Sequence, residues 1–278
     1  MRYIGMMRAR LSVWLLLTAL AAPVAAQMDY QPPPDLEPFN REYDKFLDLY
    51  ARDGIFSYRE IAGDRGTIDR YVASLNSPAV ASALAGWDRP RQIAFWINAY
   101  NAISLQTALA HYPASIHQVP GAFDRIKHAV AGQSVTLDQI ENTILAAYKD
   151  PRIYLVLGRS TMGSGRLRSE TFNGARLDAQ LAQSAEQFAT RPEKVHIDAM
   201  AGTLSVSPIF SWRSQAFIDA YADKSLDLPG RTPIELAIVG FLKPYLLKSE
   251  RDFLEKNTWK LVYMDYDWKL NDRRGLPK

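Results

Sequence analysis

The stretch Ile93-Ala-Phe-Trp-Ile-Asn-Ala-Tyr-Asn-Ala-Ile-Ser-Leu-Gln-Thr-Ala-Leu109 decides the fold of this chain. Apolar residues fall on nearly every side of its helical wheel, and a helix that is apolar all round is a buried one. Its length is marginal for a membrane span, and its three carboxamide side chains argue against contact with lipid. The stretch therefore predicts a buried central helix, capped at its start by Asp88 and ending before His111.

Two carboxamides inside this helix need partners. Asn98 and Asn101 lie three residues apart and share a face with small apolar neighbours. Buried amides are costly unless they form hydrogen bonds, so each must reach a partner. In a structural interpretation each amide holds the backbone of a neighbouring loop, whereas in a functional one the pair lines a site. We expect both to approach the run that starts at Arg152, or the loop after it.

The N-terminus has the composition of a secretory signal peptide, which we place at residues 1–26. A basic start precedes an apolar run that is short for a membrane span, and small residues occupy the cleavage positions. A Pro-rich spacer, 27–35, would then lead to a single globular domain, 36–278. These features predict a periplasmic or secreted protein with no transmembrane segment after cleavage. Retention of the apolar run as an anchor is the alternative.

Charge and composition exclude several classes of partner and of chemistry. The chain has 33 Lys and Arg against 30 Asp and Glu, and the signal peptide contains three of those Arg and no acid. The mature chain is therefore formally neutral, so we expect no nucleic-acid partner. The chain has no Cys, which excludes disulfides and thiolate chemistry. No metal-ligand spacing is present, and we predict neither a metal nor a cofactor.

The order of elements predicts an α+β fold. Helical patterns dominate, and Lys194–Ile197 and Thr203–Val206 form a predicted hairpin, with a last strand at Trp259–Met264. The hairpin argues against a purely parallel sheet. We therefore expect a helix-rich single domain around a small mixed or antiparallel sheet. The apolar run Arg152–Leu157 is predicted to be a buried strand.

The irregular loop Gly158–Arg168 is the first place to look for chemistry. Ser164 is a weak candidate nucleophile, because none of the four His lies at a spacing that identifies a catalytic triad. The arginines of the loop, Arg159 among them, would suit an anion. A surface loop with solvated arginines is the alternative interpretation.

Two aromatic rows would suit a carbohydrate platform, although core packing is the favoured interpretation because large aromatic side chains dominate cores. These rows are Phe210, Trp212, Phe217 and Tyr221, and Tyr263, Tyr266 and Trp268.

Several segments together resemble the domain of unknown function 547, a bacterial and plant family, over residues 88–271. They are Ala94-Phe-Trp-Ile-Asn-Ala-Tyr-Asn101, Val135-Thr-Leu-Asp-Gln-Ile-Glu141, Asp150-Pro-Arg-Ile153 and Tyr266-Asp-Trp-Lys-Leu-Asn271. The resemblance implies His where this chain has Asn142 and Tyr154, and Cys where it has Arg159 and Ser164. This chain therefore looks like a divergent member that lacks the family's usual thiol and imidazole groups.

We expect a non-catalytic binding or envelope-associated module, whose partner is an unidentified ligand or envelope protein. The alternative is a hydrolase of peptide, amide or ester bonds that uses Ser164 in the loop after the 152–157 strand. Residues expected to share a pocket are Asn98, Asn101, Glu141, Asn142, Arg152, Tyr154, Arg159 and Ser164.

Overall fold

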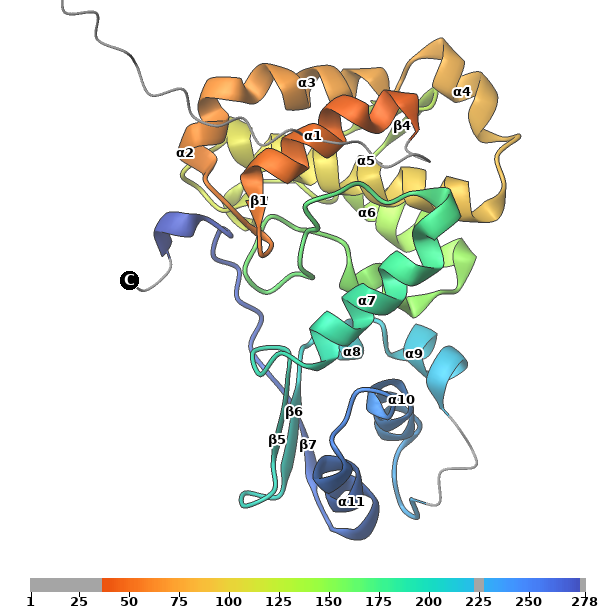
Figure 1. Ribbon diagram of the computed structural model, residues 1–278, viewed down its shortest axis with the longest axis vertical. Coiled ribbons are helices and arrows are strands. Elements are labelled where there is room, and N and C mark those ends of the chain that lie inside the picture. The colour runs from red at the N-terminus through yellow and green to blue at the C-terminus, as the bar shows by residue number, and fades with distance from the viewer. Residues whose placement is uncertain (1–36, 223–227, 276–278) are drawn as a thin grey trace, which may run out of the picture. The chain divides into compact units, whose positions relative to one another are not determined.

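Helix α5 (Arg89–Ala110) is the buried central helix that the sequence predicts (Figure 1). In this computed structural model, which describes residues 37–222 and 228–275, every residue from 93 to 109 except Gln106 is buried. The Asp88 side chain caps the helix by accepting a hydrogen bond from the Arg91 N–H at 2.9 Å. Pro90 occupies the first turn, where no intrahelical N–H is needed.

The other α-helices pack around or beyond α5, and both α3 and α7 contact it directly. They are α1 (Arg41–Tyr50), α2 (Tyr58–Ile61), α3 (Arg65–Ser74), α4 (Pro78–Leu84), α6 (Leu137–Gln139), α7 (Leu177–Ala189), α8 (Ile209–Trp212), α9 (Ser214–Tyr221), α10 (Pro233–Leu242) and α11 (Lys248–Lys256).

Short 3₁₀ turns and one π turn connect these helices. They are η1 (Pro38–Asn40), η2 (Ala62–Asp64), η3 (Ile116–Gln118), the π turn η4 (Ile140–Leu145), η5 (Ala146–Tyr148), η6 (Pro151–Leu155), η7 (Gly174–Arg176) and η8 (Arg273–Gly275).

The largest sheet among the described residues has three strands in the order β5-β6-β7. The hairpin strands β5 (Val195–Asp198) and β6 (Thr203–Val206) are antiparallel, and β7 (Lys260–Tyr263) lies parallel to β6 (Figure 1). Two antiparallel pairs complete the strands: β1 (Ala51–Arg52) with β2 (Ile55–Phe56), and β3 (His128–Val130) with β4 (Gln133–Val135). The prediction of a helix-rich α+β fold with a small mixed sheet is confirmed.

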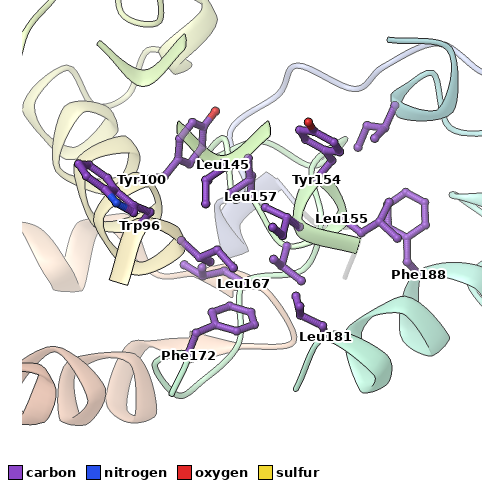
Figure 2. Close-up of a cluster of buried hydrophobic side chains, with 14 of the residues drawn as sticks. Trp96, Tyr100, Leu145, Tyr154, Leu155, Leu157, Leu167, Phe172, Leu181 and Phe188 are labelled. Atoms are coloured by element: carbon purple, nitrogen blue, oxygen red, sulfur yellow. The ribbon is translucent and has the colours of Figure 1, made fainter. Parts of the chain in front are cut away.

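The strand predicted at Arg152–Leu157 is wrong, because the chain forms the 3₁₀ turn η6 there. The Asp150 side chain accepts a hydrogen bond from the Arg152 N–H at 3.0 Å, and Pro151 presets the first turn. The run is buried as expected, and in Figure 2 Leu155 and Leu157 lie between side chains of α5 and α7. Apolar periodicity alone does not separate a short buried strand from a buried helical turn.

The helical segment from Leu137 to Tyr148 is composite. Its cap is Thr136, which exchanges hydrogen bonds with Gln139 in a capping box. The helix α6 continues directly into the π turn η4 and then the 3₁₀ turn η5. Single π turns are often found at functional sites, and η4 contains Glu141.

The predicted signal peptide, 1–26, and spacer, 27–35, lie outside the described residues. Within residues 37–222 and 228–275, no helix combines the length and the apolar character that a bilayer crossing requires.

Candidate binding pocket

A buried carboxylate, Glu141, forms the floor of the pocket. Its side chain is 2% exposed, and its Oε2 accepts a hydrogen bond from the Tyr100 hydroxyl at 3.0 Å. Its Oε1 accepts hydrogen bonds from two guanidinium groups, those of Arg159 and Arg213. Three donors from α5, the loop after η6 and the α8–α9 junction therefore meet on one carboxylate.

Glu141 and the two arginines stabilise one another's charged forms. Burial opposes ionisation of Glu141, but Arg159 and Arg213 outweigh it and lower the pKa of the carboxyl below its ordinary value. Burial likewise opposes the charge on Arg159, and Glu141 outweighs it, so the pKa of Arg159 is raised. Burial, reinforced by the Glu141 charge, raises the pKa of the Tyr100 hydroxyl well above its ordinary range. At neutral pH the floor contains two cations, one anion and a neutral phenol.

Arg159 and Arg213 both have side-chain donors without partners among the described residues. Arg159 is 5% exposed, and its Nη1 is buried and donates to no atom of the described residues. The buried Nε of Arg213 is also unpaired within that part of the chain, while the guanidinium lies over the Tyr154 ring at 4.8 Å from its centre. Figure 2 shows the hydroxyl groups of Tyr100 and Tyr154 projecting from the same side of the apolar core. Unpaired buried guanidinium donors are costly and call for an acceptor.

Aromatic side chains line the pocket above this floor. Trp212 and Trp268 have ring centres 6.1 Å apart with planes inclined at 27°, and Phe123 approaches Trp268 edge-on at 6.4 Å. Trp212 is 43% exposed, which is unusual for so large a side chain. Together with Asp138, Glu141 and the arginines they line an open cavity of about 330 Å³.

Further rings support the wall from behind. His117 stacks on Trp268 at 4.3 Å, and Tyr266 packs against the same indole at 4.4 Å. The Ser115 hydroxyl donates to the Trp268 carbonyl oxygen at 2.5 Å. Trp268 is therefore held in place by contacts on several sides, although it belongs to no helix or strand.

Asp138 is the second carboxylate of the pocket. Burial raises its pKa above the ordinary value, and the charges of Glu141 and Asp124 add to that effect, while Arg213 and Arg159 oppose it. The environment therefore shifts the pKa values of the two carboxyl groups in opposite directions. Glu141 is held ionised, and Asp138 takes up a proton more readily.

The structure brings together only part of the predicted pocket. Glu141 and Arg159 are in contact, and Tyr154 joins them through Arg213. Asn142 is exposed instead of facing the pocket. Arg152 pairs with Asp150 at 2.8 Å and Asp178 at 2.9 Å, so it is a structural residue away from this pocket.

The two carboxamides of α5 follow the structural interpretation. Asn101 donates to the Val156 carbonyl oxygen at 3.1 Å and accepts from the Gly158 N–H at 2.7 Å. Asn98 makes the same pair of bonds with Phe172, at 2.8 and 2.9 Å. The expected contact with the 152–157 run or the loop after it is confirmed for Asn101, and Asn98 holds a different loop. Neither residue lines the pocket.

Ser164 lies in a separate cavity of about 70 Å³, which Arg166 and Lys194 also line. Its hydroxyl donates to the Thr161 carbonyl oxygen at 2.6 Å. No His is among the described residues around this cavity, but burial lowers the pKa of Lys194 to about 8. The Lys194 ammonium donates to the Met162 carbonyl oxygen at 2.8 Å.

Of the loop arginines, Arg159 alone lines the pocket, since Arg166 pairs with Asp53 and Arg168 with Glu170. Among the described residues, no group of His, Asp and Glu side chains is arranged to hold a metal ion.

Sequence reasoning missed four residues of the site: Tyr100, Phe123, Asp138 and Arg213. It noted Trp212 and Trp268 in its aromatic rows but favoured core packing for both rows. That interpretation is confirmed for Phe210 and Phe217, which are fully buried, and wrong for the two Trp residues, which line the cavity. Phe210 and Trp212 differ in exposure because they project from opposite sides of the short helix α8.

The fold and the pocket define a helix-rich α+β protein with a charged, aromatic-walled cavity. Residues 84–189 match the family model described as "Protein of unknown function, DUF547", and this match supports membership of that family. This segment supplies Glu141, Arg159, Asp138 and Phe123, whereas the two Trp residues and Arg213 lie beyond it. No match was found among the curated proteins or the solved structures.

Proposed function

We propose that this protein is a non-catalytic binding module that takes a small ligand into the pocket between Phe123, Trp212 and Trp268. The observation that supports the proposal most directly is that Arg159, whose buried Nη1 has no partner among the described residues, lines an aromatic-walled cavity. A cavity with apolar walls and few convergent polar groups is typical of a ligand site.

The pairing of Glu141 supports binding over catalysis. Both carboxylate oxygens accept hydrogen bonds, from Tyr100, Arg159 and Arg213, and the side chain is buried. A carboxylate held in this way is a poor nucleophile or proton carrier, because its charge is already compensated. Asp138 alone would then have to supply both halves of an acid–base pair.

The test is a fragment screen against the purified mature chain, read by protein NMR or tryptophan fluorescence. We expect hits that perturb Trp212 and Trp268 and that are lost in Trp212→Ala. Tyr263→Ala is the matched control, because Tyr263 is a comparably exposed aromatic residue, 39% against 43%, outside the pocket. A broad library without a single pocket hit would contradict the proposal.

We also propose that the chain is exported to the periplasm or secreted, as part of or in contact with the cell envelope. The support is the basic, apolar and small-residue order of residues 1–26. Fractionation of cells that express the full chain, with sequencing of the mature N-terminus, tests it. Recovery of uncleaved protein from the cytoplasm would contradict export, and recovery with membranes would favour the anchor alternative.

A hydrolase that uses Ser164 is the second candidate, and one observation favours it. Ser164 shares its small cavity with Lys194, whose pKa of about 8 leaves a fraction of the amine neutral at pH 7 and able to accept a proton. Ser164→Ala is compared with the unaltered chain on a panel of esters, amides and peptides. Turnover that disappears in Ser164→Ala and in Lys194→Met would establish the hydrolase. If the unaltered chain and both variants hydrolyse the panel only at the background rate, the hydrolase is contradicted and the binding module remains the proposed function.

A further inference from the structure

We propose that the ligand of this pocket is a saccharide that carries one carboxylate group. This inference rests on the proposed binding function and adds the chemical class of the ligand. It is argued from the charge of the floor, the geometry of the walls and the position of Asp138.

The floor has an excess of positive charge. Arg159 and Arg213 both donate to one oxygen of Glu141, so two guanidinium groups share one carboxylate. Each arginine also has a buried donor without a partner in the described part of the chain. Guanidinium groups bind carboxylates well because their planar fork of donors matches the two oxygens. With Asp138 counted, the pocket as a whole is formally neutral, so the excess of positive charge lies at the floor alone. A carboxylate of a ligand would bind there, next to the two guanidinium groups.

The walls favour a ring with an apolar face. The Trp212 and Trp268 planes are inclined at 27° with centres 6.1 Å apart, so they form an angled surface and not a slot for a flat aromatic ring. The C–H face of a pyranose packs on such indole surfaces while its hydroxyls point outward. A volume of about 330 Å³ is at the small end for ligand pockets, which fits a short saccharide.

Asp138 separates a saccharide from other anions. Its half-buried carboxylate lines the cavity and accepts no hydrogen bond from the described residues, so it can accept hydrogen bonds from a ligand. Sugar hydroxyls supply such donors, whereas an aromatic carboxylate leaves Asp138 facing an apolar surface. A phosphate dianion would meet repulsion from Asp138 and exceed the single positive charge in excess at the floor.

The experiment is titration calorimetry on the mature chain with a matched pair of disaccharides. Cellobiouronate, a glucuronosyl-glucose, differs from cellobiose by one carboxylate in place of a CH₂OH group. We expect cellobiouronate to bind at least about tenfold more tightly, as a charge-assisted hydrogen bond predicts. Raising the salt concentration to about 0.5 M should narrow this gap, because partly exposed charges are screened.

Two variants assign the preference to residues. Arg213→Gln should reduce the preference for cellobiouronate over cellobiose to within about threefold. It should weaken the binding of cellobiouronate and leave the affinity for cellobiose nearly unchanged. Arg231→Gln is the matched control, because Arg231 also pairs with a Glu, at 3.4 Å, and stacks on a Trp, at 3.5 Å, but outside the pocket. Trp212→Ala should weaken both disaccharides to the same extent. Thermal unfolding of each variant shows whether it is folded.

Several results would overturn the inference. Equal affinity for the two disaccharides would contradict the inferred carboxylate of the ligand. Affinity for 2-naphthoate equal to or higher than that for cellobiouronate would contradict the inferred saccharide. Tighter binding of inorganic phosphate than of cellobiouronate points to a phosphorylated ligand instead. If neither disaccharide binds while the fragment screen gives pocket hits, the ligand class is wrong and the binding function stands. A screen without pocket hits contradicts both.

Discussion

At the scale of single residues, Glu141 is the group on which the pocket depends. It compensates two arginines that approach it from different parts of the chain, and Tyr100 occupies its second oxygen. A buried ion pair adds little net stability, but removal of one partner leaves the other charge buried and uncompensated. The same cluster therefore makes the pocket sensitive to both substitution and pH.

Glu141→Gln should lower the free energy of unfolding by about 3–5 kcal/mol at neutral pH. The pKa of Glu141 is lowered in the folded chain, so its contribution is complete above its ordinary pKa of 4.5 and is lost as the pH falls below that value. Urea unfolding at pH 7 and at acidic pH measures the effect. The difference between the two proteins should narrow on acidification, and a constant difference would contradict this assignment.

Asp138→Asn should strengthen the binding of cellobiouronate by roughly threefold at pH 7, because one negative charge near the ligand's carboxylate is removed. In the unaltered protein affinity should rise as the pH falls toward the raised pKa of Asp138, since burial, Glu141 and Asp124 favour its protonated form against Arg213 and Arg159. Cellobiose is the control, and its affinity should not rise in Asp138→Asn, because cellobiose carries no charge and its hydroxyls lose a charged acceptor. A rise with falling pH that persists in Asp138→Asn would assign the effect to another group.

At the scale of elements, α5 positions the loops on which the site is built. Asn101 binds the backbone on both sides of Leu157, and Gly158 leads directly to Arg159. Asn98 performs the same task for Phe172, which is away from the pocket. Asn98 and Asn101 therefore make equivalent hydrogen bonds from one helix, but only those of Asn101 position a residue of the pocket.

Asn101→Ala and Asn98→Ala should each destabilise the fold by about 2–4 kcal/mol, because each leaves a buried N–H and a buried carbonyl without a partner. Only Asn101→Ala should also weaken ligand binding, by several-fold, since it releases the backbone before Arg159. Chemical unfolding and calorimetry on both variants provide the comparison. Equal loss of affinity in the two would show that the effect is global.

At the scale of the whole molecule, the C-terminal segment joins distant parts of the chain. Asn271 accepts a hydrogen bond from the Tyr58 hydroxyl at 2.7 Å and donates to the Gly54 carbonyl oxygen at 2.8 Å. Three residues earlier, Trp268 forms a wall of the pocket. The stability of the fold and the shape of the pocket are therefore coupled through this segment.

Asn271→Ala should destabilise the protein by about 2–4 kcal/mol, as expected when two buried polar groups lose their partners. Its melting temperature should fall by roughly 5–10 °C, and affinity for the pocket ligand should fall with it. Asn257→Ala is the control, because the Asn257 side chain donates to the Phe253 carbonyl oxygen in an exposed position. A lower melting temperature with unchanged affinity would show that the segment does not shape the pocket.

The sequence by itself determined the buried helix α5, its Asp88 cap, the β5–β6 hairpin and the need of Asn98 and Asn101 for hydrogen-bond partners. These features are local, because apolar periodicity, capping residues and the cost of burying an amide act within a few residues. It misjudged Arg152–Leu157, where a short apolar run fits two backbone conformations equally well.

Only the tertiary structure decided where the pocket lies. Its floor and walls combine residues from 123 to 268, and no local pattern links Glu141 to Arg213 or Trp212 to Trp268. Such contacts depend on how helices and loops pack against one another over long sequence separations. A buried charge needs its partner in space, and the folded chain alone brings that partner within reach.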